Sequence, residues 1–106
     1  MKENVIQLKT FEFAVRIVKL YQYLVEEKKE RVLSKQILRY GTYIGANTEE
    51  ALGGYSKKEF ASKIGIAYKE ARETDYWLRL LKETKFISGT GFKSLQTDCE
   101  EILKIL

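Results

Sequence analysis

The sequence predicts an all-α protein folded as an antiparallel, up-down-up-down four-helix bundle. Proline is absent from its 106 residues, so nothing in the chain forbids long uninterrupted helices. Apolar residues recur at alternating spacings of three and four, which is the period of a buried helix face. Short polar or glycine-containing segments separate four such stretches, and short connections make sequence neighbours antiparallel. Residues 1–106 are therefore expected to form a single domain.

The first helix is expected to begin between Val5 and Thr10, with Thr10 as its N-cap, and to end near Lys29. Glu12 would then lie in the first turn, where a negative charge suits the helix macrodipole. Two adjacent apolar stripes give this helix a broad face that can contact two neighbouring helices. The first stripe contains Phe13, Ile17, Leu20 and Leu24, and the second contains Ala14, Val18, Tyr21 and Val25.

The second helix is expected from about Ser34 to Leu52, and the face that it turns inward is unusually small. This seam consists of Ile37, Gly41, Ile44, Thr48 and Ala51. A glycine inside a helix costs about 1 kcal/mol relative to alanine. The spacing of Gly41 and Gly45 therefore predicts the close approach of another helix, and Gly65 is a candidate partner.

The third helix is expected to run from Lys57 to about Thr84, roughly 40 Å at 1.5 Å per residue. Ser56 follows a Gly53-Gly54 turn and precedes Glu59 by three residues, so it matches a capping box and predicts the N-cap. The apolar seam of this helix is predicted to contain Phe60, Ile64, Ala67, Ala71, Thr74, Leu78 and Leu81. This helix is the predicted spine of the bundle.

The fourth helix is expected from about Phe92, after a connection with two glycines. Leu95, Cys99, Ile102 and Leu106 recur at spacings of four, three and four. Cys99 lies on this apolar stripe, and nothing near it in the sequence would lower its pKa. It is therefore interpreted as a small buried apolar residue rather than as a nucleophile.

The composition gives little support to catalysis. The chain has no histidine and one cysteine, so the commonest general base is missing and a zinc site cannot be built. We expect no catalytic residue, no metal and no cofactor, and hence no enzyme. The net charge of +4 is compatible with a polyanionic partner. The first residues have no long apolar core, so neither a signal peptide nor a membrane anchor is expected and the predicted location is the cytoplasm.

One face of the third predicted helix combines basic residues with an aromatic residue. Lys69, Arg72, Tyr76 and Arg79 recur at helical spacing away from the apolar seam. Such a face can hold phosphates by charge and stack a base on Tyr76. The alternative is an ordinary solvated face with ion pairs such as Lys69 with Glu73.

A second face of the same helix mixes large apolar groups with charges. Its members are Lys63, Ile66, Glu70, Glu73 and Trp77. Mixed character of this kind suits a subunit interface, and packing of Trp77 inside the monomer is the alternative. Glu70 and Glu73 are expected to pair with Arg39, Lys63 or Lys69, within the chain or across a subunit boundary. Asn47, Glu50 and Glu70 are interpreted as structural polar residues that fix helix register.

The runs QILRYGTYIGANTEEA, YSKKEF and IAYKEARETDYWLRLL resemble a family of four-helix bundle proteins encoded by intervening sequences in bacterial 23S rRNA genes. Members of this family form homopentameric rings. A related protein is the accessory factor of diversity-generating retroelements, and its basic surface is proposed to engage nucleic acid and a reverse transcriptase. The resemblance therefore implies a homopentamer that binds RNA or DNA, or a protein partner. The candidate contacts are Lys57, Lys58, Lys69, Arg72 and Arg79, with Lys28, Lys29 and Arg31 at another end.

The functional hypothesis is a non-enzymatic, oligomeric protein that binds RNA or another nucleic acid through repeated basic surface. A structural or protein-interaction adaptor without intrinsic nucleic-acid affinity is the alternative. Arg39, Gly41, Gly45, Asn47 and Glu50 are assigned structural roles in either case.

Overall fold

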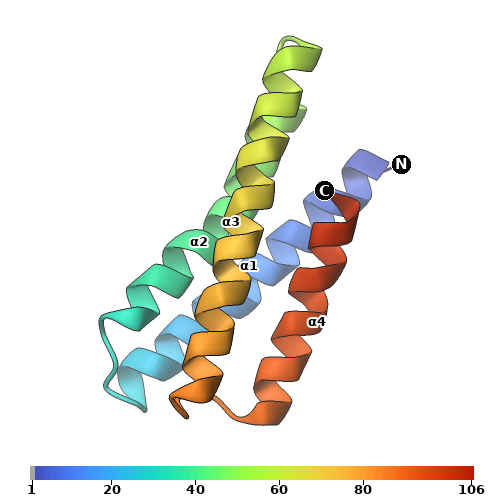
Figure 1. Cartoon of the computed structure of the whole chain (residues 1–106). Coiled ribbons are helices and arrows are strands. Elements are labelled where there is room, and N and C mark those ends of the chain that lie inside the picture. The colour runs from blue at the N-terminus through green and yellow to red at the C-terminus, as the bar shows by residue number, and fades with distance from the viewer. Residues whose placement is uncertain (1) are drawn as a thin grey trace.

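The computed structural model describes residues 2–106, with side chains from Val5 onward, and contains four helices and no strand within that range. The helices are α1 (Lys2–Glu26), α2 (Leu33–Leu52), α3 (Lys57–Glu83) and α4 (Gly89–Ile105). Successive helices run in opposite directions (Figure 1). The predicted all-α four-helix bundle is confirmed.

The four helices stand at the corners of a square in chain order. The α2 helix packs along both α1 and α3, whereas α4 contacts α3 and, less extensively, α1. The diagonal pairs, α1 with α3 and α2 with α4, do not approach closely. The turn between α2 and α3 projects beyond the two chain ends (Figure 1), and the molecule measures 43 × 22 × 18 Å. One end of the bundle is therefore only a two-helix hairpin.

The core lies on the predicted apolar seams except at this hairpin and along the second predicted stripe of α1, where Ala14, Tyr21 and Val25 are only partly buried and Val18 is exposed. All five residues of the predicted α2 seam are buried. In α3 the seam is buried from Ala67 to Leu81, but Phe60 is 40% exposed and Ile64 is only partly buried. The prediction that Phe60 belongs to the core is wrong, because the first turns of α3 lie in the projecting hairpin.

The two glycines of α2 lie against α1. A Cβ atom added to Gly41 would come within 2.6 Å of Ile17 Cγ1, and one added to Gly45 would come within 3.2 Å of the Thr10 carbonyl oxygen. Nothing lies within 4 Å of the corresponding position on Gly65. The predicted close approach exists, but Gly65 is not its partner.

The N-terminal boundaries of α1 and α4 differ from those expected. Thr10 is not an N-cap, because α1 begins at Lys2 and Thr10 is a buried interior residue whose hydroxyl donates to the Gln7 carbonyl oxygen at 3.2 Å. The α4 helix begins at Gly89 rather than near Phe92, because Ser88 Oγ accepts the Gly91 N–H at 3.0 Å. Ser56 caps α3 as predicted, since its Oγ accepts the Glu59 N–H at 3.1 Å.

The connection between α1 and α2 is held by a carboxylate. The α1 helix ends at Glu26 rather than near Lys29, and Lys29 has a φ of 56°, in the left-handed region. The Glu30 side chain is largely buried and accepts hydrogen bonds from the N–H groups of Val32, Leu33 and Ser34. It thereby satisfies amides at the start of α2 that have no partner within the helix, and its charge suits the helix macrodipole.

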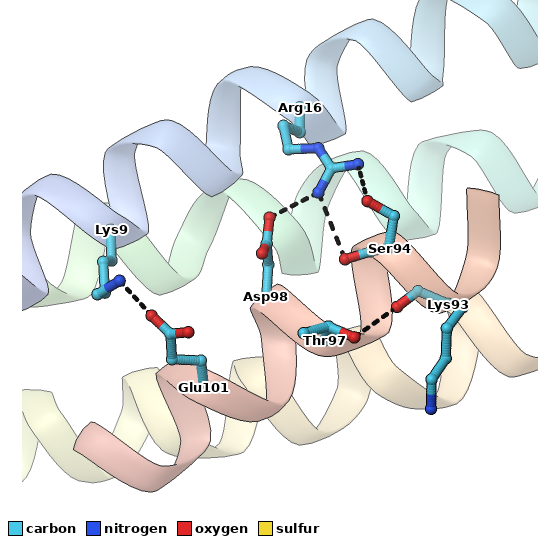
Figure 2. A network of polar contacts seen from close by, with 7 residues as sticks. All are labelled: Lys9, Arg16, Lys93, Ser94, Thr97, Asp98 and Glu101. Carbon is cyan, nitrogen blue, oxygen red and sulfur yellow. Dashed lines mark hydrogen bonds and ion pairs between the residues drawn. The ribbon is translucent and has the colours of Figure 1, made fainter. Parts of the chain in front are cut away.

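Polar contacts join α1 to α4. Arg16 donates to Asp98 Oδ2 at 2.6 Å and to Ser94 Oγ at 2.9 Å, and Lys9 pairs with Glu101 (Figure 2). The four charged side chains are each more than a third exposed, and Ser94 is exposed as well. Surface ion pairs contribute about 0–1 kcal/mol each. This seam is therefore held more weakly than the apolar seams on either side of α2.

Candidate nucleic-acid interface

The predicted basic face of α3 is on the outside of the bundle. Lys69, Arg72, Tyr76 and Arg79 are all exposed and, with Glu73, line a shallow depression of about 490 Å³. We call these four residues the α3 basic stripe. The structure thus brings together the side chains that the sequence grouped.

Ion pairing within the α3 basic stripe differs from the expected pattern. Arg79 Nε donates to Asp75 Oδ2 at 3.1 Å, and its guanidinium lies 5.9 Å from the centre of the Tyr76 ring. Lys69 and Arg72 form no ion pair with any described residue, so the anticipated pairing of Lys69 with Glu73 is not formed. Two of the three cations therefore remain available to an external anion.

Lys57 and Lys58 belong to a separate patch. They are exposed in the first turn of α3, beside the fully exposed Tyr55 at the tip of the hairpin. At 1.5 Å per residue, Lys58 and Lys69 are about 16 Å apart along the helix. A ligand that contacts both patches would have to extend along α3.

The predicted interface residues of α3 lie on its α2-facing flank. Lys63 Nζ is 3.1 Å from Glu50 Oε1 on α2, so this pair joins the two helices. Ile66 is 37% exposed, and Glu73 is exposed. Trp77 packs against the apolar core, and its ring meets that of Tyr76 edge-on at 5.2 Å between centroids. Packing within the monomer therefore already buries most of the Trp77 ring.

Two buried polar atoms on this flank lack a partner. Glu70 Oε2 and Trp77 Nε1 are both inaccessible and form no hydrogen bond within residues 2–106. Burial raises the pKa of Glu70, the Arg39 charge opposes that rise, and Glu73 adds to it. Neither Glu70 nor Glu73 forms an ion pair with a described residue, so the expected pairs are absent within the chain, and pairing across a subunit boundary stays a prediction. These two atoms are two helical turns apart, and the described residues leave both without a hydrogen-bond partner.

The polar residues assigned structural roles in α2 act mostly within their own helix. The Arg39 guanidinium lies 5.6 and 5.8 Å from the ring centres of Tyr40 and Tyr43. Asn47 Nδ2 donates to the Tyr43 carbonyl oxygen at 3.0 Å. Of Asn47, Glu50 and Glu70, only Glu50 forms an ion pair or hydrogen bond with another helix among the described residues, and a role of the other two in fixing register stays a prediction.

Sequence reasoning missed an exposed apolar face on α1. Leu8 and Phe11 are 58% and 66% exposed, and Val15 and Val18 are about 40% exposed. Their spacings of three, four and three place all four on one side of the helix. We call them the α1 apolar face. The same spacing rule could have found it, because Leu8, Phe11 and Val15 lie beside Val18, which the sequence had already placed on the second apolar stripe.

The family model for 23S rRNA-intervening sequence proteins matches residues 2–106. The chain belongs to this family. It is also similar to a crystal structure of a protein of unknown function from the S23 ribosomal protein family of Bacteroides thetaiotaomicron, with 53% identity and a TM-score of 0.98. That match covers 99% of this chain and 94% of the other. No curated protein matches the chain.

Family membership supports the resemblance read from the middle of the sequence. Within residues 2–106, no helix combines the length and hydropathy that a membrane crossing would require. In the same range, no group of three or more histidine, cysteine, aspartate or glutamate side chains is arranged to hold a metal ion.

Proposed function

We propose that this intervening-sequence family protein is a non-enzymatic homo-oligomer that binds RNA in the cytoplasm through the α3 basic stripe. The observation that carries the proposal is the pair of cations, Lys69 and Arg72, held on one rigid helix without a carboxylate partner among the described residues. Tyr76 lies between them and Arg79, where its exposed ring can stack on a base. A helix positions such groups more rigidly than a loop.

Self-association would multiply the weak affinity of one stripe. The α1 apolar face supports an oligomer, because monomers seldom leave a continuous stripe of large apolar side chains in water. The α1 and α3 helices are diagonal partners, so assembly through the outer side of α1 leaves the α3 basic stripe accessible. The family resemblance favours a pentamer, and five linked stripes would gain avidity without any new contact.

The α1 apolar face also supports a second candidate function. An adaptor that binds another protein through this face, with no affinity of its own for nucleic acid, would need the same exposed side chains. Direct measurement of RNA binding separates the two functions.

The test measures binding of a labelled, structured RNA by fluorescence anisotropy between about 50 and 200 mM salt. Each phosphate contact contributes about 0.7–0.9 to the slope of log affinity against log salt. Combining Lys69→Glu with Arg72→Glu should therefore lower the magnitude of that slope by about 1.5 and weaken binding at least about tenfold. Helicity and oligomer mass should be unchanged, because both side chains are exposed.

The matched control combines Lys35→Glu with Lys104→Glu, which makes the same charge change at two exposed positions on α2 and α4. It should reduce affinity only through the change in overall charge. If the wild-type protein does not bind RNA at about 50 mM salt, the RNA-binding function is excluded and the adaptor function remains. Equal losses in the two variants would assign RNA binding to net charge rather than to the α3 basic stripe.

A further inference from the structure

A basic groove lies at the end of the bundle opposite the projecting hairpin. Two adjoining concavities of about 470 and 460 Å³ meet there and share the lining residues Tyr23, Ile87 and Ser88. One continues between α1 and α4, beyond the Arg16–Asp98 contact, and the other continues over the end of α3. Among the neighbouring helix pairs, α1 and α4 pack together least extensively, which leaves room for a groove between them.

The groove is lined by positive charge without compensating carboxylates. Its basic lining residues are Arg16, Lys19, Lys28, Lys82 and Lys85. No aspartate or glutamate lines either concavity. Arg16 is paired with Asp98, whereas none of the four lysines forms an ion pair with a described residue. These four ammonium groups, one in the first concavity and three in the second, favour a polyanion.

The floor and one wall of the groove are apolar and aromatic. Leu20 and Leu95 line the first concavity, Ile87 lines both, and Tyr23, at the junction of the two concavities, is 42% exposed. The Lys28 ammonium lies 5.9 Å from the centre of the Tyr23 ring. An aromatic ring beside several cations suits a planar base that carries a phosphate, whereas a free inorganic anion would use only the lysines.

The groove also continues the α3 basic stripe. Lys82 follows Arg79 by three residues, which is almost one helical turn. From Lys69 to Lys82 the basic track is about 20 Å long at 1.5 Å per residue. An RNA strand bound to the α3 basic stripe can therefore run directly into the groove at Lys82.

We propose that the basic groove binds an unpaired nucleotide of the RNA, with its base stacked on Tyr23 and its phosphates held by Lys28, Lys82 and Lys85. This inference rests on the proposed RNA-binding function and specifies which part of the RNA is recognised. A base within a duplex is already stacked on its neighbours, so a duplex could offer only its phosphates to the rim. The groove would thus make the protein prefer RNA with single-stranded segments.

The test compares a labelled single-stranded RNA oligonucleotide with a fully paired duplex of the same length, by anisotropy. Tyr23→Leu keeps an apolar side chain but removes the stacking surface. It should weaken binding of the single strand about 5- to 100-fold and leave duplex binding unchanged. Tyr55→Leu is the matched control, because Tyr55 is the most exposed tyrosine and lies at the other end of the molecule.

A second variant tests the phosphate contacts. Lys82→Gln with Lys85→Gln should weaken single-strand binding and lower the magnitude of its salt slope by about 1.4. If Lys69→Glu with Arg72→Glu abolishes binding while both groove variants bind normally, the groove inference is overturned and the proposed function stands. Equal losses on single strand and duplex for Tyr23→Leu would also overturn it. Absence of any RNA binding by the wild-type protein would remove the proposed function and the groove inference together.

Discussion

Buried polar side chains in this bundle satisfy most of their hydrogen bonds locally. Thr48 and Thr74 donate to the carbonyl oxygens of Ile44 and Glu70, four residues earlier, each at 2.8 Å. Cys99 is an exception, since its Sγ is 3.3 Å from the Ala71 carbonyl oxygen on α3. A residue with a predominantly apolar role therefore also forms a polar contact between α3 and α4.

The environment of Cys99 leads to a prediction about its reactivity. Burial raises the pKa of the Cys99 thiol to about 12, and the charges of Asp75, Glu100 and Asp98 act in the same direction. Alkylation requires the thiolate. At pH 8, iodoacetamide should react at least about a thousandfold more slowly with the folded protein than with the unfolded chain, whose thiol has a pKa near 8.5. Mass spectrometry of timed samples, with and without denaturant, measures both rates.

The same pKa shift has a consequence for stability. Because the folded state holds the Cys99 proton more tightly than the unfolded state, the contribution is complete below the unfolded pKa and is lost as pH rises toward about 12. Cys99→Ala should remove that part of the alkaline stability loss. Rapid labelling of the native protein at pH 8 would contradict the buried environment and show that the α3–α4 contact opens readily.

At the scale of elements, the two glycines of α2 let α1 and α2 approach each other closely. Gly41 leaves room for the Ile17 side chain, which is fully buried, and Gly45 lies against the backbone of Thr10. Small residues let two helix backbones approach closely, so contacts that a larger side chain would prevent become available. Packing against α1 thereby offsets the free-energy cost of placing two glycines inside α2.

Paired alanine substitutions test this account. In Gly41→Ala the new Cβ would lie 2.6 Å from Ile17 Cγ1, so Ile17 or the whole helix must move, at about 1–3 kcal/mol. Gly65→Ala places its Cβ in open space and should stabilise the protein by up to about 1 kcal/mol. Calorimetry should show Tm falling for the first variant and rising for the second. A Gly41→Ala variant as stable as the wild type would mean that α1 and α2 can separate at little cost.

The α2 glycines also show how much of the helix packing the sequence could predict. Their spacing predicted a thin helix face with a close neighbour, but the same spacing carries no information about which helix that neighbour is. The start of α1 was misplaced because Thr10 is an acceptable N-cap residue whose burial depends on contacts with α2. The basic groove was not foreseen because Lys19, Lys28 and Lys82 come together only after the helices pack.

At the scale of the whole molecule, apolar and basic surfaces occupy different sides of the bundle. The α1 apolar face and the α3 basic stripe lie on diagonal helices, and the α3 flank with Glu70 and Trp77 lies on the side of α2. Assembly of one surface of a copy against a different surface of the next is heterologous, and such contacts close into rings when the rotation permits. The α1 apolar face and the α3 flank are the two surfaces that such a ring would use.

This arrangement predicts an oligomer. A single substitution on either of the two surfaces should disrupt it. Wild-type protein in light scattering should show about five times the 12.4 kDa mass of one chain. Phe11→Glu places a charge on the α1 apolar face, and Ile66→Glu places one on the α3 flank. Both residues are more than a third exposed in the monomer, so each variant should remain helical. Each should nevertheless fail to form rings, because burying the new charge in the interface is costly.

Mixing the two variants distinguishes a heterologous ring from a symmetric dimer. A Phe11→Glu copy retains an intact α3 flank, and an Ile66→Glu copy retains an intact α1 apolar face, so one good contact can form between them. In a heterologous ring the mixture should therefore contain a species of twice the chain mass, although neither variant alone does. If α1 instead pairs with α1 of a second copy, Ile66→Glu alone would remain dimeric and the mixture would contain no new species. A wild-type protein that is monomeric at micromolar concentration would contradict both arrangements and leave the α1 apolar face to a different partner.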